Sequence, residues 1–183
     1  MGKGIVSVFG ASSAEPGGPD YRQAERLGRL LAEAGYDVMT GGYAGLMEAA
    51  SKGAKEAGGR VVGVTVVAFE RAGHAPNPYI DEVIVYNTLS ERLLHLVRAC
   101  DAAVALPGGI GTLSEVALTW SLLQVSEIKP MPFVLVGEQW ANLLRVAYGQ
   151  GEYIREHDMH LFEVARTPEQ AVMLIRNWEI VEL

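Results

Sequence analysis

The residues best suited to chemistry lie in one glycine-rich loop, which follows a short apolar run and precedes a helical pattern. A helix N-terminus presents unpaired N–H groups and a partial positive charge, and glycines let an anion approach without a Cβ in the way. The loop therefore predicts a phosphate site. The alternative is a tight turn that needs glycine for its geometry alone. The predicted phosphate ligands are Gly108, Gly109, Ile110, Gly111 and Thr112.

Two charged residues are candidates for catalysis beside this loop, Glu115 and Arg92. Glu115 lies three residues after Thr112, where a carboxylate could hold ribose hydroxyls or activate a water molecule. The alternative for Glu115 is a capping-box glutamate that reaches back to the backbone of Thr112. Arg92 lies in the first turn of the preceding predicted helix, where it could contact phosphate or ribose. The alternative for Arg92 is a solvated surface arginine.

A second glycine-rich loop, Gly41–Gly45, also follows a predicted strand and opens a helix. Two such turns at strand ends favour a nucleotide-sized ligand, although both could be structural turns. Neither loop fits a dinucleotide fingerprint or a Walker A loop, because Gly10–Ser13 follows the first strand and no Gly-Lys-Ser/Thr is present. We expect the base to lie against Gly10–Ser13 and the 68–80 loop. The predicted substrate contacts from these turns are Gly41, Gly42, Gly45 and Ser12.

The elements that must position these loops alternate strictly between strand and helix patterns. Strands that are apolar on both faces indicate a parallel sheet covered by helices on both sides. The sequence therefore predicts an α/β fold, a Rossmann-like doubly wound parallel sheet in one domain over residues 1–183, with its ligand site at the C-terminal strand ends. Strands are expected at 5–9, 37–40, 61–67, 82–86, 102–106, 133–136 and 161–164.

Local signals predict where several helices begin. Asp20 is expected to be the N-cap of the first helix, and Thr88 with Glu91 forms a predicted capping box for the fourth. Thr167 and Pro168 open the last helix. Residues 68–80 are the least regular stretch and are expected to form a loop.

Composition excludes several functional classes. The 183 residues are 49% hydrophobic and 20% charged, which is ordinary for a compact globular protein. The formal net charge of −7 argues against a basic nucleic-acid binder. The single cysteine, Cys100, excludes an intrachain disulfide, and no apolar run approaches membrane length. We expect a cytoplasmic protein with a small-molecule partner and with no nucleic-acid or membrane partner. We also expect no metal, because no cluster of side chains has metal-ligand spacing.

Two motifs carry a resemblance to a known family. Residues 107–115 read PGGIGTLSE and resemble the PGGxGTxxE motif of the LOG (LONELY GUY) family. Residues 41–48 read GGYAGLME and resemble that family's GGGxxGLMG motif. Arg92 stands where the family has the arginine of its ERK motif, at the family's spacing of 23 residues from Glu115. The resemblance extends from Ser7 to about Ile175.

The resemblance implies a Rossmann-like fold and a homodimer or larger even oligomer. Family members are cytokinin riboside 5′-monophosphate phosphoribohydrolases, which release the base and ribose 5-phosphate from a nucleoside monophosphate, and many accept AMP. Arg92 and Glu115 fall on the family's catalytic pair. An older family label, possible lysine decarboxylase, implies pyridoxal phosphate. No lysine here lies in a recognisable setting for that cofactor, and we expect no cofactor.

The sequence departs from the family pattern at four positions. The third glycine of the first motif is Tyr43, and the lysine after the catalytic arginine is Leu93. The glycine after Leu-Met is Glu48, and the first of the family's paired glutamates is Ser114. A related branch, the molybdenum cofactor carrier proteins, binds a phosphorylated pterin on a similar fold without known catalysis. The alternative function is therefore a non-catalytic nucleotide or molybdenum cofactor carrier.

Overall fold

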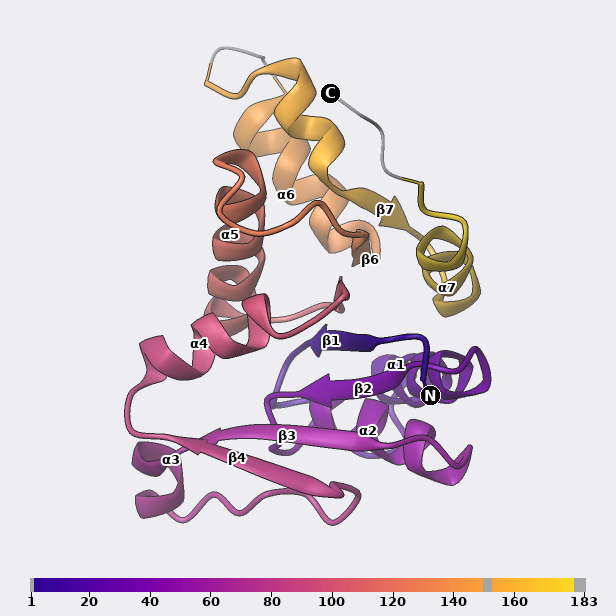
Figure 1. The fold of residues 1–183 in the computed structure, drawn as a ribbon, viewed down its shortest axis with the longest axis vertical. Coiled ribbons are helices and arrows are strands. Elements are labelled where there is room, and N and C mark those ends of the chain that lie inside the picture. Colours follow the sequence, from indigo (N-terminus) through magenta and orange to yellow (C-terminus); the bar gives the residue numbers. More distant parts are fainter. Residues whose placement is uncertain (1, 150–152, 180–183) are drawn as a thin grey trace.

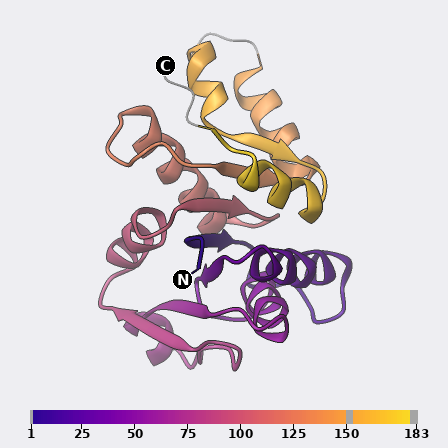
Figure 2. The ribbon, with the colours of Figure 1, turned by 45° about the vertical axis from the view of Figure 1, so that its right-hand side comes forward.

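The computed structural model describes residues 2–149 and 153–179, and it shows one parallel sheet flanked by helices (Figure 1). The seven strands lie in the order β4-β3-β2-β1-β5-β6-β7. All pairs are parallel, and the register aligns Val8 of β1 with Thr40 of β2 and Val104 of β5. Figure 2 shows the sheet in this order from β4 at the bottom to β7 near the top. The predicted Rossmann-like α/β fold is confirmed.

Strands and helices alternate along the chain as the sequence pattern predicts, with few exceptions. The strands are β1 Ile5–Phe9, β2 Asp37–Thr40, β3 Val61–Val66, β4 Glu82–Tyr86, β5 Ala102–Ala105, β6 Phe133–Val136 and β7 Glu163–Ala165. The helices are α1 Pro19–Glu33, α2 Leu46–Glu56, α3 Val67–Arg71, α4 Leu89–Arg98, α5 Ile110–Gln124, α6 Glu138–Tyr148, the 3-10 helix η1 Glu156–Leu161, and α7 Pro168–Arg176.

The sheet buries a hydrophobic core on each face. Helices α1, α2 and α7 cover one face, where Leu27, Leu31 and Leu46 are almost fully buried. Helices α4, α5 and α6 cover the other face, where Leu96 and Trp140 are buried against β-strand residues. Because both faces are covered, the central strands are apolar on both sides, which explains their continuous β-branched runs.

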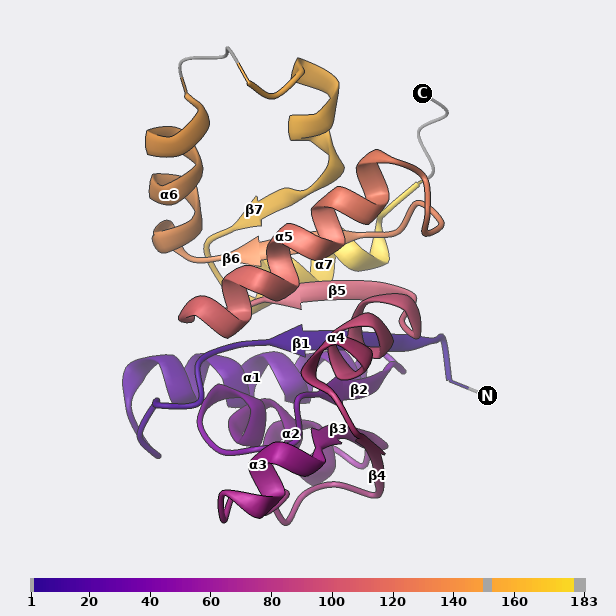
Figure 3. The same cartoon turned by 90° about the vertical axis from the view of Figure 1, so that its left-hand side faces the viewer.

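The order of the strands places the ligand crevice between β1 and β5. The chain proceeds from β1 toward β4 in one direction and then returns to β5 on the other side of β1. In such sheets the loops diverge at this reversal and leave a crevice outside the C-terminal strand ends. Figure 3 shows α5 beginning beside the ends of β1 and β5. The glycine loop therefore opens into the crevice.

Three local predictions need correction. Helix α1 begins at Pro19 with Gly18 as its N-cap, so Asp20 lies in the first turn and is not the cap. Proline is favoured at the first helical position because its missing N–H has no partner there in any case. The expected 68–80 loop starts with the short helix α3, and the last strand, expected at 161–164, is β7 Glu163–Ala165 after η1.

Other local predictions are confirmed. Thr88 and Glu91 make the reciprocal hydrogen bonds of a capping box at the start of α4. Thr167 accepts a hydrogen bond from the Gln170 N–H at the start of α7. Within residues 2–149 and 153–179, no helix combines the length and the apolar character needed to span a membrane.

Candidate active site

A cavity of about 470 Å³ lies at the C-terminal ends of the strands. Its wall is built from the segments that follow β1, β2, β3, β4 and β5, which is the arrangement expected at the reversal of strand order. The predicted residues Arg92, Glu115, Gly109–Thr112 and Ser12 all contribute to it. The remaining lining residues are Gly10, Ala11, Ser13, Tyr43, Met47, Phe69, His74 and Leu89.

Arg92 is fixed in the wall of this cavity by backbone carbonyl groups. Its Nε donates to the carbonyl oxygen of Val64 at 2.7 Å, and its Nη2 donates to that of Gly41 at 3.0 Å. The residue is only 5% exposed, so the solvated surface arginine is excluded. Burial lowers the pKa of Arg92, and the nearby Glu115 opposes that effect. Two of its three nitrogens are occupied, and Nη1 faces Glu115.

Glu115 lies opposite Arg92, and its carboxyl group has a raised pKa. Its Oε1 is 4.0 Å from Nη1 of Arg92, and the residue is 7% exposed. Burial raises the pKa of Glu115 to about 7, and the positive charge of Arg92 limits the rise. A strongly perturbed carboxyl group in a cavity is typical of an acid–base residue, although structural ion pairs also perturb pKa values. The pair can therefore take up or release a proton near neutral pH.

The helix-cap alternative for Glu115 is wrong. Helix α5 begins at Ile110 with Gly109 as its N-cap, and this cap receives no side-chain hydrogen bond. Glu115 therefore lies beyond the first turn, and Thr112 is not the cap that a capping box would require. The backbone carbonyl of Glu115 accepts a hydrogen bond from Oγ1 of Thr119, and the carboxylate faces Arg92.

The start of α5 is open where a phosphate would approach. A Cβ added to Gly109 or Gly111 would meet no heavy atom within 4 Å, so both glycines face free space. The first N–H groups of a helix have no partner within it. Because Gly109, Ile110, Gly111 and Thr112 line the cavity, this terminus can bind an anion.

Gly108 has a different environment from the other predicted phosphate ligands. Its N–H donates to Oε1 of Gln139 at 3.1 Å, and its carbonyl accepts from Nε2 of Gln139 at 2.9 Å. A Cβ at Gly108 would lie 2.2 Å from Oγ1 of Thr112. The glycine is therefore required for close packing, and Gln139 at the start of α6 fixes the loop. Sequence reasoning missed Gln139, although it lies within the stretch over which the sequence resembles the LOG family.

The second glycine loop positions Arg92 and α2. A Cβ at Gly41 would lie 2.1 Å from Nη2 of Arg92, so only glycine permits that contact. Gly45 has φ +72°, and its position against Ala11 and Ser12 brings the loop up to the turn after β1. The cavity wall does not include Gly41, Gly42 or Gly45. A direct contact between these three and a substrate stays a prediction.

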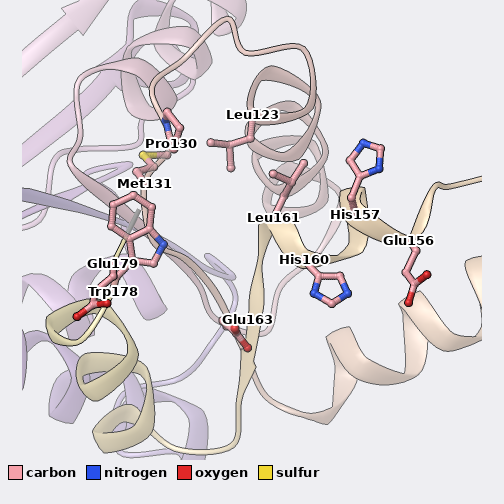
Figure 4. Close-up of a pocket in the computed structure, with 10 residues that line it drawn as sticks. All are labelled: Leu123, Pro130, Met131, Glu156, His157, His160, Leu161, Glu163, Trp178 and Glu179. Atoms are coloured by element: carbon pink, nitrogen blue, oxygen red, sulfur yellow. The ribbon is translucent and has the colours of Figure 1, made fainter. Parts of the chain in front are cut away.

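A larger cavity of about 640 Å³ lies near the C-terminal end of α5, beside η1 and the segment after α7 (Figure 4). Figure 4 shows Trp178 and Glu179 on one side and Glu156 and His157 on the other, so its polar groups do not converge. The Nε2 atom of His157 lies 3.1 Å from Oδ1 of Asp158, so His157 already has a partner. No three His, Cys, Asp or Glu residues within 2–149 and 153–179 are grouped to hold a metal. We therefore place the candidate active site in the smaller cavity.

A comparison with protein families matches residues 3–128 to the model of the SLOG cluster4 family. The chain belongs to the SLOG cluster4 family. The match includes both glycine loops, Arg92 and Glu115. The SLOG assignment and the names of related proteins confirm the resemblance to LOG proteins that the two motifs indicate.

Relatives of this SLOG chain include enzymes that act on nucleotides. A cytokinin riboside 5′-monophosphate phosphoribohydrolase from Rhodococcoides fascians is 35% identical over 144 residues, which cover 76% of this chain and 71% of that protein. A pyrimidine/purine nucleotide 5′-monophosphate nucleosidase from Escherichia coli is 28% identical over 86% of this chain, which spans 39% of that protein. The molybdenum cofactor binding protein from Rippkaea orientalis has a similar structure, with a TM-score of 0.75 and 29% identity over 96% of this chain and 97% of that one.

Proposed function

We propose that this protein hydrolyses the N-glycosidic bond of a purine nucleoside 5′-monophosphate, AMP or an N6-substituted AMP, to free base and ribose 5-phosphate. The observation that carries the proposal is the buried pair of Glu115 and Arg92, 4.0 Å apart, in a cavity that also contains the open start of α5. A phosphate site and an acid–base residue in one cavity suit a substrate in which a phosphorylated sugar carries a glycosidic bond that can be hydrolysed. The names of the relatives support the same reaction class.

The 5′-phosphate would bind at the N-terminus of α5. The N–H groups of Ile110, Gly111 and Thr112 can donate to its oxygens, and the helix dipole favours negative charge there. Such a site contributes little to a neutral nucleoside. The proposal therefore requires the monophosphate as substrate.

Glu115 and Arg92 would act on the ribose. When the bond between C1′ and the base nitrogen breaks, its electron pair leaves with the base and positive charge develops on the sugar. The carboxylate of Glu115 stabilises this charge and orients the attacking water, which forms the new bond to C1′. One water proton can pass to Glu115, since its pKa is about 7, and then on to the departing base. Arg92 holds the carboxylate in place and contacts phosphate or ribose.

A second function has its own support. Besides the Rippkaea protein, solved relatives include the molybdenum cofactor carrier protein from Chlamydomonas reinhardtii, with a TM-score of 0.72 and 26% identity. A non-catalytic nucleotide or molybdenum cofactor carrier would use the same phosphate site. We place hydrolysis first because the buried Glu115 faces Arg92 inside the cavity and because relatives are named as nucleotide-hydrolysing enzymes.

Incubation with a panel of nucleoside monophosphates, with detection of free base, tests the two functions. The hydrolase releases adenine from AMP or the modified base from an N6-substituted AMP. A carrier releases no base from any nucleotide and is purified from its host with a fluorescent pterin bound. That second result would replace the proposal.

We also propose that the protein forms a homodimer or a larger even oligomer. Helix α5 has one charged residue, Glu115, and that residue faces the cavity, so the outer face of α5 is uncharged. Leu94 and Leu113, on α4 and α5, are each 37% exposed. An uncharged helix face with exposed leucines favours association. Light scattering at micromolar concentration should give at least twice the monomer mass of 19.7 kDa, and a monomer would refute the proposal.

A further inference from the structure

Three aromatic rings form a cluster in the wall of the cavity. Tyr43 follows β2, Phe69 lies on α3, and His74 lies in the segment after α3. The ring centroids of Tyr43 and Phe69 are 5.5 Å apart, those of Tyr43 and His74 are 6.3 Å apart, and those of Phe69 and His74 are 6.1 Å apart. All three residues line the cavity, and we call them the aromatic corner.

The aromatic corner is held in place from behind by polar contacts. The hydroxyl of Tyr43 donates to the Val66 carbonyl at 3.2 Å and accepts from the Val66 N–H at 2.9 Å. Helix α3 is fixed by a hydrogen bond from Thr65 to Glu70 at 2.9 Å. The buried Asn77 donates from Nδ2 to the carbonyl oxygens of Gly42 and Tyr43, each at 3.2 Å. The corner is therefore organised before a ligand arrives.

Two of the three rings keep surface free for a ligand. Tyr43 is 6% exposed and serves as the fixed support, whereas Phe69 is 38% exposed and His74 is also exposed. A large apolar ring that lines a cavity and remains over one-third exposed can still bury area against a flat partner. Aromatic side chains stack with every nucleobase, because each base has a π-face.

The charged residues lie between the corner and the phosphate loop. The guanidinium carbon of Arg92 is 5.8 Å from the ring centroid of Tyr43, and Nη1 of Arg92 is 4.0 Å from Glu115. Glu115 lies on α5, whose first residues form the phosphate loop. The order along the cavity is therefore aromatic rings, then the charged pair, then the helix N-terminus.

This order matches the order of groups in a nucleoside monophosphate. A phosphate at the helix N-terminus places the ribose beside Glu115 and Arg92 and the base beside the rings. The reverse orientation would put the phosphate against the negative faces of aromatic rings, which is unfavourable. We propose that Tyr43, Phe69 and His74 form the base subsite, in which Phe69 and His74 stack on the base and Tyr43 supports them. This inference rests on the proposed function, because it takes the ligand to be a nucleotide.

Binding measurements on Phe69→Ala test the inference. They are made in a Glu115→Gln background, so that AMP is not consumed, and ribose 5-phosphate serves as the matched ligand without a base. Loss of one stacking partner should weaken AMP binding by about 5-fold to 100-fold. Binding of ribose 5-phosphate should change less than about twofold, since neutral surface substitutions have effects within that range. Phe69→Tyr, which keeps the ring, should bind AMP like the parent.

Two outcomes would overturn the base subsite. One is AMP affinity that is unchanged by Phe69→Ala. The other is an equal loss for AMP and ribose 5-phosphate, which would show that Phe69 only supports the phosphate site. Tyr153→Ala, at an 87% exposed aromatic residue outside the cavity, controls for loss of any surface ring. If Phe69→Ala does not fold, Phe69→Leu removes the ring while keeping apolar volume and is read in the same way.

The same experiment separates this inference from the proposed function. Failure of hydrolysis leaves the binding comparison intact, because binding is read without turnover. If the parent releases base but Phe69→Ala binds AMP normally, the hydrolase stands and the base subsite falls. If neither AMP nor ribose 5-phosphate binds, both proposals fall together.

Discussion

Replacing Glu115 by Gln should make the protein more stable and much less active. Glutamine resembles protonated glutamic acid in size and charge, so the variant imitates the uncharged form at every pH. Burial raises the pKa of Glu115 from 4.5 to about 7. Each tenfold change in proton affinity corresponds to about 1.4 kcal/mol, so the charged carboxylate lowers the free energy of unfolding by about 3 kcal/mol at high pH.

The sign of the stability effect depends on pH. The folded protein holds the Glu115 proton more tightly than the unfolded chain, so the stabilising contribution is fully present below pH 4.5 and is lost as pH rises through about 7. Glu115→Gln does not lose this contribution. Urea unfolding should therefore show the variant more stable than the parent at about pH 8, by up to about 3 kcal/mol, and nearly equal to it at about pH 4.

Activity should change in the opposite direction. The negative charge that destabilises the fold is the one that stabilises the developing cation, and removal of one such preorganised group slows enzymes by roughly 10²–10³-fold. Adenine release from AMP, measured by chromatography, should fall by that factor while AMP still binds. Glu127→Gln, on an exposed glutamate paired with Arg98, is the matched control and should leave turnover unchanged.

Two results would refute this reasoning. Retention of more than about a tenth of the parent turnover would remove Glu115 from the chemistry, because the expected loss is at least tenfold larger. A variant that is less stable than the parent at about pH 8 would show that the charged carboxylate supports the fold, contrary to its raised pKa.

Three further predictions follow from the same contacts. The kcat/KM for AMP should rise with pH up to about pH 7, as Glu115 ionises, and should level off at higher pH. A flat profile between about pH 5 and 8 would contradict a catalytic carboxylate. Arg92→Lys keeps the positive charge, but a lysine cannot donate to both the Val64 and the Gly41 carbonyls. The kcat should therefore fall roughly tenfold, which is the equivalent of one charged hydrogen bond. Normal turnover would show that the charge alone suffices. Gln139→Ala removes both hydrogen bonds to Gly108 and should raise KM for AMP by about fivefold, with kcat little changed; an unchanged KM would exclude a role in the phosphate site.

The architecture was predictable because each element carries its own periodicity. Apolar runs such as Ile5–Phe9 and Ala102–Ala105 are buried on both faces, and this pattern alone specifies a covered parallel sheet. The sequence pattern did not specify the strand order. The structure shows that this order reverses at β1, and that both glycine loops lie at the C-terminal edge of the sheet. The phosphate loop and the approach of Arg92 to Glu115 could be expected from these rules and from motif spacing.

Other features of the site depend on contacts between distant segments. The burial of Arg92 results from the carbonyls of Val64 and Gly41, 28 and 51 residues away, and no local pattern indicates them. The aromatic corner combines Tyr43 from the connection after β2 with Phe69 and His74 from the connection after β3. Glu115 was open to interpretation as a cap because the start of α5 could not be fixed to the residue, and the structure places that start at Ile110.

The most direct test of the proposed function compares AMP with adenosine as substrates for one preparation of the protein. Free adenine and ribose 5-phosphate are quantified together by nuclear magnetic resonance, which separates glycosidic cleavage from loss of phosphate. Because the site recognises phosphate at the N-terminus of α5, AMP should yield adenine and ribose 5-phosphate in equal amounts while adenosine yields no adenine. Equal rates on AMP and adenosine, or no base released from any nucleoside monophosphate, would contradict the account.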